Sequence, residues 1–140
     1  MRLDFKRVEK PFVFEVENEE GVTCRIDASE HVGGKSKGLR PMELLAASLA
    51  GCAAIDILAI LEKQRTKSEK FNIEIEGKRS SEPPSVFEWI HLDIQVDDHI
   101  DKERLKKTVD LVLEKYCSVA ASLNRNIHLK YSINALTAEL

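Results

Sequence analysis

The sequence predicts one α+β domain spanning residues 1–140, in which a long buried helix and a second, amphipathic helix lie between segments of strand. Two observations lead to this prediction. Several short segments alternate apolar and polar residues, which is typical of strands with one buried face. Residues 44–61 form a nearly continuous apolar run, which is too long for a strand and fits a helix surrounded by protein.

The composition is that of a folded domain of ordinary size. The chain has 140 residues, of which 43% are hydrophobic and 32% charged, so it can bury a core without metal or disulfide staples. Acidic and basic residues are mixed along the chain and leave a net charge of −3, which argues against nucleic acid as a partner. The first residues lack the apolar stretch of a signal peptide, so we expect the protein in the cytoplasm.

Three regions of strand are predicted. The alternating residues 12–16 and 22–26 flank a turn at 19–21 and indicate a hairpin. Residues 71–75 and 90–96, separated by two prolines, indicate a second hairpin, and residues 127–133 predict a final strand. Residues 31–40 carry three glycines and three cations without an apolar period, which predicts a mobile loop.

Two helices are predicted between these strands. Pro41 suits the first position of the long helix, where a missing backbone N–H costs nothing. A membrane-spanning role is disfavoured because Asp56, near the middle of this helix, would be costly in lipid. Asp101 can cap the second helix, whose apolar residues fall on one stripe. A small monomer cannot cover a helix that is apolar on all sides, so we expect a homodimer.

Cys52 and Cys117 are the first candidates for chemistry. Cys52 lies one turn after Ser48 and one turn before Asp56, so the three residues form a polar stripe on the apolar helix. Cys117 lies eight residues after Val109, which places it at the border of the apolar stripe of the second helix. Packing alone also explains both positions, because free cysteine is among the most buried residue types.

The remaining cysteine and the histidines are weaker candidates. Cys24 alternates with the apolar residues of its strand, which predicts a core position. An odd number of cysteines, three, does not indicate a secreted disulfide framework. No metal site is expected, because short paired ligand spacing is missing among the four histidines, His31, His91, His99 and His128.

Two segments around the cysteines resemble the motifs of a known family. Residues 41–52, with the sequence PMELLAASLAGC, are similar to the first cysteine motif of the OsmC/Ohr family of hydroperoxide-reducing proteins. Residues 114–119, with the sequence EKYCSV, are similar to the second. Residues 55–58 and 109–111 are similar to the YhfA-like branch of that family.

The resemblance implies an OsmC-like fold in which a long central buried helix and a second helix are wrapped by antiparallel sheets. It also implies an intertwined homodimer with its active sites at the subunit interface. It also implies a mechanism in which the Cys52 thiolate attacks a hydroperoxide, becomes a sulfenic acid, and is resolved by Cys117 as a disulfide. A dithiol, in the family commonly a lipoylated protein, then restores the thiols, and no metal, haem or flavin cofactor is required. The apolar surroundings of Cys52 suit an organic hydroperoxide.

The sequence departs from the family pattern at the groups that activate the attacking thiol. Met42 stands where the peroxidases carry a glutamate, and Glu43 points to the side of a straight helix opposite the attacking cysteine. Arg25 and Arg40 are the nearest candidates for the family's activating arginine. Asp56 would disfavour a thiolate one turn away.

The leading hypothesis is therefore an enzyme that reduces organic hydroperoxides through Cys52 and Cys117. The alternative is a dimeric protein of the same fold that binds a small apolar ligand and has weak or lost peroxidase activity. The missing glutamate and arginine favour the alternative, and the paired cysteines favour the enzyme. A purely structural partner protein is a third hypothesis.

Overall fold

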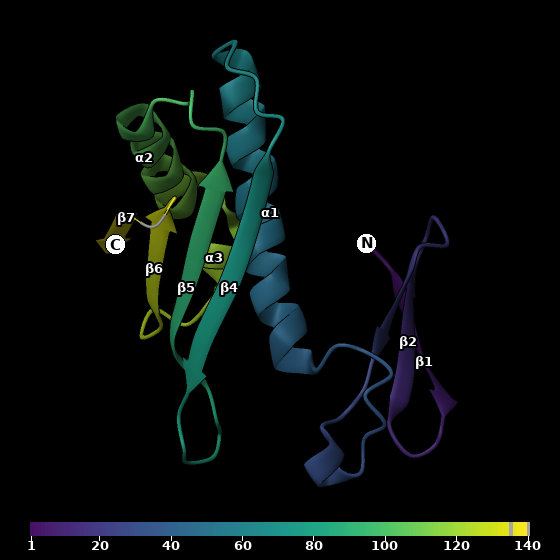
Figure 1. The fold of residues 1–140 in the computed structure, drawn as a ribbon. Coiled ribbons are helices and arrows are strands. Elements are labelled where there is room, and N and C mark those ends of the chain that lie inside the picture. Colours follow the sequence, from purple (N-terminus) through teal and green to yellow (C-terminus); the bar gives the residue numbers. More distant parts are fainter. Residues whose placement is uncertain (135, 140) are drawn as a thin grey trace. The chain divides into compact units, whose positions relative to one another are not determined.

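The computed structural model describes residues 1–134 and 136–139 and divides into an N-terminal unit, Met1–Leu45, and a C-terminal unit, Ala46–Leu140 (Figure 1). The N-terminal unit is built on a three-stranded antiparallel sheet with the order β1 (Leu3–Glu9), β2 (Val13–Asn18) and β3 (Thr23–Ile26). The hairpin predicted over residues 12–26 is confirmed as β2 and β3. Strand β1 was not predicted, because four of its seven residues are charged.

The two faces of this sheet differ in polarity. Phe5, Phe14 and Val16 share one face, where the rings of Phe5 and Phe14 stack with their centroids 4.9 Å apart. Glu15 and Arg25 lie opposite each other on the other face. Phe5 is nevertheless 58% exposed, so the apolar face is only partly covered within this chain.

A buried carboxylate fixes the segment that follows β3. Asp27 is 1% exposed and accepts hydrogen bonds from the backbone N–H groups of Ala28 (2.8 Å), Lys35 (2.8 Å) and Lys37 (3.1 Å). Burial opposes the charge of Asp27, but the three N–H donors outweigh it and hold its pKa below the usual value. The amines of Lys35 and Lys37 each lie 2.6 Å from the carboxylate of Glu9, whose pKa they lower to about 2.

Close packing explains the glycines of this loop. The short 3-10 helix η1 (Glu30–Val32) ends at Gly33, whose φ of 95° is a left-handed conformation that favours glycine. A Cβ at Gly34 would lie 1.8 Å from the carbonyl oxygen of Ala28, so a side chain does not fit there. The loop that the sequence predicted to be mobile is tied by charge pairs and backbone hydrogen bonds instead.

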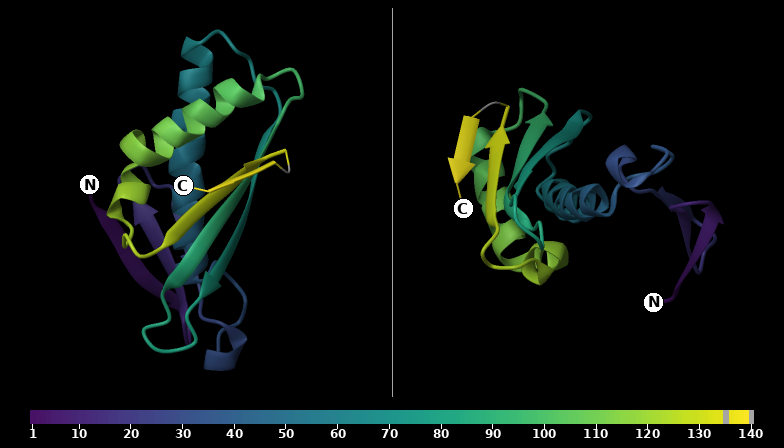
Figure 2. Two further views of the ribbon diagram at one scale, coloured as in Figure 1. Left: turned by 90° about the vertical axis from the view of Figure 1, so that its left-hand side faces the viewer. Right: turned by 90° about the horizontal axis from the view of Figure 1, so that it is seen from below.

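The C-terminal unit packs helices on one face of a four-stranded sheet (Figures 1 and 2). The sheet has the order β4 (Phe71–Arg79), β5 (Phe87–Val96), β6 (His128–Ile133) and β7 (Leu136–Glu139). The helices are α1 (Pro41–Lys63), α2 (Lys102–Leu111), the π-helical turn η2 (Val112–Tyr116) and α3 (Ser118–Ser122). Fully buried side chains of the sheet, such as Ile90 and Tyr131, and of the helices, such as Leu49 and Leu105, make up the core.

The long helix, the second hairpin and the cap at Asp101 are confirmed. The side chain of Asp101 accepts a hydrogen bond from the backbone N–H of Arg104 at 2.6 Å and begins α2. The prediction of purely antiparallel sheets is wrong, because β6 pairs in parallel with β5. The chain crosses over through α2, η2 and α3 between these strands, and such a crossover returns it in the same direction. β7 then follows the strand that was predicted to close the chain.

Helix α1 is covered on one side only within this chain. Its buried stripe consists of Ala46, Leu49, Ala50, Ala53, Ile57 and Leu61. Ile55, on the other side, is 70% exposed. The helix is long and apolar enough to cross a membrane. Of its most apolar stretch of 18 residues, 33% is buried, whereas the sequence predicted a helix buried on all sides.

Candidate functional site

Cys52 lies in the middle of α1 on the flank of the buried stripe. It is half-buried, next to the fully buried Ala53 on one side. On the other side is Gly51, where a Cβ would meet nothing within 4 Å. Ser48 is exposed and Asp56 is half-buried, so the predicted polar stripe lies along the partly open flank of the helix. Cys52 therefore has protein on one side and open space on the other.

Cys117 is positioned by an irregularity after the second helix. The backbone widens into the π-helical turn η2, which is closed by the N–H of Cys117 donating to the carbonyl of Val112 at 2.8 Å. Cys117 then adopts an extended backbone and caps α3, where its Sγ accepts a hydrogen bond from the N–H of Ala120 at 3.4 Å. It therefore lies at a junction between two helices and not within the second helix, as its spacing from Val109 had indicated.

The two cysteines that were predicted to act together are in contact in the structure. Both are free thiols, and a side-chain hydrogen bond joins Cys117 to Cys52. Burial of Cys117, which is 2% exposed, is the main reason why its pKa rises to about 11. The bond to Cys52 and the charge of a Cys52 thiolate raise this pKa further, and the N–H of Ala120 partly offsets them. Cys117 is therefore a protonated thiol at neutral pH.

A buried polar pair ties the segment that leads to Cys117 to the sheet. Tyr131 on β6 is fully buried, and its hydroxyl donates to the carboxylate of Asp110 in α2 at 2.5 Å. Lys106 donates to the other carboxylate oxygen at 3.0 Å. Burial, followed by the bond to Asp110, raises the pKa of Tyr131 well above its usual value. The sequence analysis missed this pair, because Tyr131 carried no signal beyond its place on an apolar strand face.

The two candidate arginines already have carboxylate partners in the N-terminal unit. Nε of Arg25 lies 3.6 Å from a carboxylate oxygen of Glu15, on the charged face of the sheet. Nη1 of Arg40 lies 3.8 Å from the carboxylate of Glu43. Each guanidinium keeps further N–H donors beside the one in its ion pair.

Glu43 and Met42 lie in the first turn of α1. The carboxylate of Glu43 accepts the backbone N–H of Arg40 at 2.9 Å, which is half of a capping box, with Pro41 at the first helical position. Met42 is half-buried and brings no charge. The contacts of Glu43 are those of a helix-capping residue.

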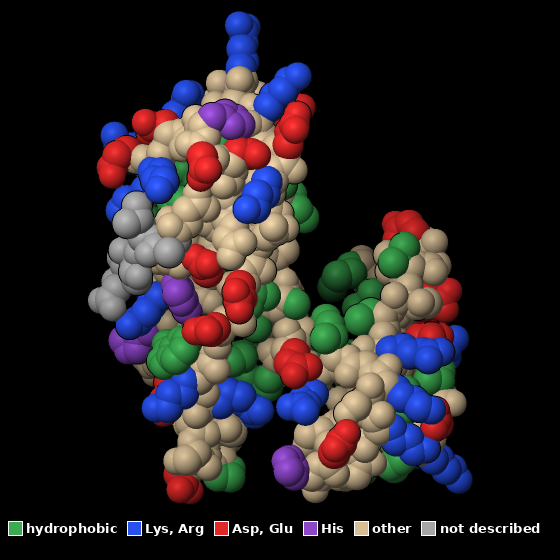
Figure 3. Space-filling model, viewed as in Figure 1, with side chains coloured by type: hydrophobic (Ala, Val, Ile, Leu, Met, Phe, Trp, Pro, Cys, Tyr) green, Lys and Arg blue, Asp and Glu red, His purple; other side chains and the backbone are tan. Residues whose placement is uncertain are grey.

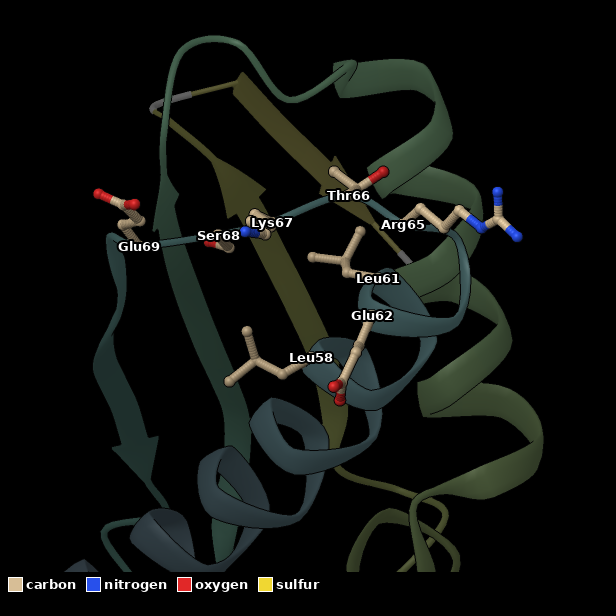
Figure 4. A pocket seen from close by; sticks show the side chains of 8 residues that line it. All are labelled: Leu58, Leu61, Glu62, Arg65, Thr66, Lys67, Ser68 and Glu69. Carbon is tan, nitrogen blue, oxygen red and sulfur yellow. The ribbon is translucent and has the colours of Figure 1, made fainter.

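A pocket of about 560 Å³ lies at the C-terminal end of α1 (Figure 4). Neither Cys52 nor Cys117 is among the residues that line it. Leu58 and Leu61 supply its apolar surface, and Arg65 points away from it. Its other lining residues are polar or charged: Glu62, Thr66, Lys67, Ser68 and Glu69. Among the described residues, no three His, Cys, Asp or Glu side chains gather as metal ligands.

Comparison with known proteins places this arrangement in a family. The model of the OsmC-like protein family matches residues 34–132, so the chain belongs to the OsmC-like family. The match includes both cysteine segments that resembled this family. Several solved structures that resemble this chain are named for organic hydroperoxide resistance.

Individual relatives agree with this assignment. Protein YhfA of Escherichia coli strain K12 is 33% identical over 103 residues, which cover 73% of this chain and 77% of YhfA. A protein from Psychrobacter arcticus named for osmotic stress and detoxification response matches with a TM-score of 0.86 at 20% identity, over 96% of both chains. An organic hydroperoxide resistance protein OsmC from Legionella pneumophila matches with a TM-score of 0.71 at 18% identity, over 95% of this chain and 96% of its own. The two structural matches establish the fold.

Proposed function

We propose that this protein is a thiol-dependent peroxidase that reduces organic hydroperoxides through Cys52 and Cys117. The observation that carries the proposal is the contact between the two thiols, which belong to elements far apart in the sequence. A sulfenic acid formed at either sulfur would have the second thiol beside it, which is what disulfide formation requires.

The environments of the two sulfurs favour Cys52 as the attacking residue. A thiol attacks a peroxide as the thiolate, and the buried Cys117 is held protonated by a pKa of about 11. Cys52 is half-buried and borders open space, so a small substrate can approach it. Ile55, one turn further along the helix, is 70% exposed in the single chain, so in the proposed dimer this approach would lie beside an apolar interface that suits an organic substrate.

The catalytic cycle that we propose has three steps. The Cys52 thiolate takes the terminal hydroxyl of the hydroperoxide, forms a sulfenic acid and releases an alkoxide, which becomes an alcohol when it takes up a proton. Cys117 then condenses with the sulfenic acid to give a disulfide and water. A dithiol reductant, such as a lipoylated protein, returns both residues to thiols by thiol–disulfide exchange. The chemistry resides in the sulfur atoms and calls for no bound cofactor.

The surroundings of this cycle are part of the proposal. We propose an intertwined homodimer in the cytoplasm, with Arg25 or Arg40 activating Cys52 and with Met42, Glu43 and Asp56 near the substrate. Free thiols suit a reducing compartment. Neither a membrane nor nucleic acid is a proposed partner. Basic and acidic side chains are mixed over the face in Figure 3, which argues against a surface that binds nucleic acid.

Two cysteine variants test the roles directly. With one equivalent of cumene hydroperoxide, the wild type should lose two thiols and form a Cys52–Cys117 disulfide within one subunit. Cys52→Ser should abolish oxidation, because no attacking thiolate remains. Cys117→Ser should stop at a Cys52 sulfenic acid that dimedone traps and excess peroxide over-oxidises. Thiol titration and peptide mass spectrometry report all three results.

Binding of a small apolar ligand is the second candidate function, and the pocket that contains Leu58 and Leu61 is the observation that favours it. The peroxide experiment separates the two candidates. If the wild type keeps both thiols in the presence of cumene hydroperoxide, the peroxidase proposal fails and ligand binding takes its place.

A further inference from the structure

The first chemical step leaves a strong base that needs a proton. When the Cys52 thiolate takes the terminal hydroxyl of R–O–O–H, the O–O bond breaks and the sulfur is oxidised to a sulfenic acid. The leaving group RO⁻ carries away the electron pair. An alcohol is a much weaker acid than a thiol, so a positioned acid that delivers a proton as the bond breaks accelerates the step.

The Cys117 thiol is a proton donor in contact with the reacting sulfur. Its hydrogen bond joins it to Cys52, and only 2% of the residue is exposed. Two bonds fix its place: its own N–H donates to the carbonyl of Val112 at 2.8 Å, and its Sγ accepts from the N–H of Ala120 at 3.4 Å. The donor is thus held beside the sulfur that attacks the hydroperoxide.

We propose that Cys117 is the general acid of the first step as well as the resolving thiol of the second. The inference rests on the proposed peroxidase function. The proton of Cys117 passes to RO⁻ and gives the alcohol ROH, which leaves a Cys117 thiolate beside the Cys52 sulfenic acid. This thiolate attacks the Cys52 sulfur, forms the S–S bond and expels hydroxide, which is released to solvent and neutralised by the buffer. One hydroperoxide is reduced, and two cysteines are oxidised.

This double role explains how so weak an acid can resolve a sulfenic acid. Burial is the main cause that raises the pKa of the Cys117 thiol to about 11, so this thiol is protonated at neutral pH. Proton transfer to the leaving alkoxide produces the Cys117 thiolate at the moment when its target appears.

The test compares two oxidants that differ in their need for a proton. Cumene hydroperoxide expels an alkoxide, whereas peracetic acid expels a carboxylate, which is stable without a proton. For Cys117→Ala we expect the rate constant of Cys52 oxidation by cumene hydroperoxide, relative to that by peracetic acid, to fall about a hundredfold. Cys117→Ser, which keeps a hydroxyl donor, should lie in between, and Cys24→Ser should match the wild type.

Alkylation of Cys52 by iodoacetamide provides the internal control. This reaction needs the thiolate but expels iodide and requires no proton, so it corrects for any change in the ionisation of Cys52. The inference is overturned if the Cys117 variants slow both oxidants by the same factor as alkylation. It is also overturned if Asp56→Asn, and not Cys117→Ala, lowers the ratio of the two oxidants, because the donor would then be Asp56.

Failure of the inference and failure of the proposed function give different results. If wild-type Cys52 reacts with neither oxidant, the peroxidase proposal itself is wrong. If the Cys117 variants do not fold, the wild type still provides a test through its rates in heavy and ordinary water. A solvent isotope effect confined to cumene hydroperoxide supports proton delivery, and equal effects with both oxidants overturn it.

Discussion

Three cysteines lie in three environments in this chain, and each environment determines what the thiol can do. Cys117 is buried and hydrogen-bonded, Cys52 is half-buried at an open flank, and Cys24 is half-buried on β3 opposite Val16. The Sγ of Cys24 donates to the carbonyl of Arg25 at 3.7 Å. The core position predicted for Cys24 is therefore only half realised, because its sheet face is partly exposed.

We expect Cys24→Ser to leave peroxide consumption unchanged. In the described structure the contacts of Cys24 are to its own sheet, and the second thiol beside Cys52 is Cys117. The measurement is the initial rate of cumene hydroperoxide loss with a dithiol reductant. A loss of rate as large as that caused by Cys52→Ser would assign Cys24 to the reaction and contradict the proposed pair.

Sequence motifs located both contacting cysteines, but they did not reveal how Cys117 is held. The π-helical turn at Val112–Tyr116 contains no glycine or proline, so an ordinary helix was the natural extrapolation. The bond between Tyr131 and Asp110 joins residues 21 positions apart, and neither position alone indicates it. Such long-range polar contacts depend on the tertiary fold.

At the scale of the elements, the loop before α1 is organised by a carboxylate and not by an apolar pattern. Asp27 gathers three backbone N–H groups, while Glu9 gathers the amines of Lys35 and Lys37. These contacts lead directly into Arg40 and the capped start of α1. The loop thereby fixes where the long helix begins.

Asp27→Asn is expected to loosen this loop. The Oδ2 atom of Asp27 accepts hydrogen bonds from the N–H groups of Lys35 and Lys37. An amide nitrogen in its place is itself a donor and could not accept these bonds. Hydrogen exchange at the amides of Lys35 and Lys37 should become several-fold faster. Asp98→Asn, at an exposed position, is the matched control and should not change it.

The same carboxylates predict acid sensitivity of the loop. Because the folded chain lowers the pKa of Asp27 and Glu9, these carboxylates contribute fully to the stability of the loop at pH values above the ordinary pKa range of carboxyl groups. It should be lost as the pH falls from about 4.5 toward the pKa of about 2 that Glu9 has in the folded chain. Protection of the Lys35 and Lys37 amides from hydrogen exchange, relative to an unfolded chain at the same pH, would contradict the assignment if it stayed constant over this range.

Local pattern predicted the elements better than it predicted their pairing. Alternation of apolar and polar residues identified β2, β3, β4, β5 and β6. Alternation carries no information on strand direction, so the parallel pairing of β6 with β5 was missed. The charged residues of β1 hid its alternation.

At the scale of the whole molecule, each unit taken by itself leaves apolar surface exposed. In the N-terminal unit Leu3 is 54% and Phe5 58% exposed, although they share a face with other apolar residues. In the C-terminal unit Ile55 is 70% exposed in the middle of the most apolar helix. Large apolar side chains exposed to this extent favour a contact with another molecule.

A second copy of the chain is the partner that we expect for α1. One side of this helix is buried, and on the exposed side a Cβ at Gly51 would meet nothing within 4 Å, so another helix can approach there. Sedimentation equilibrium at micromolar concentration should therefore give about twice the chain mass of 15.8 kDa.

A pair of lysine substitutions locates the interface of this dimer. Ile55→Lys should shift the mass toward one chain, because it would bury a charge against the partner. Val86→Lys introduces the same charge at a 46% exposed apolar residue next to β5 and should leave the dimer intact. A wild-type mass of one chain would rule out the dimer. Equal dissociation by both substitutions would move the interface away from α1, and with it the expectation that the active sites lie between subunits.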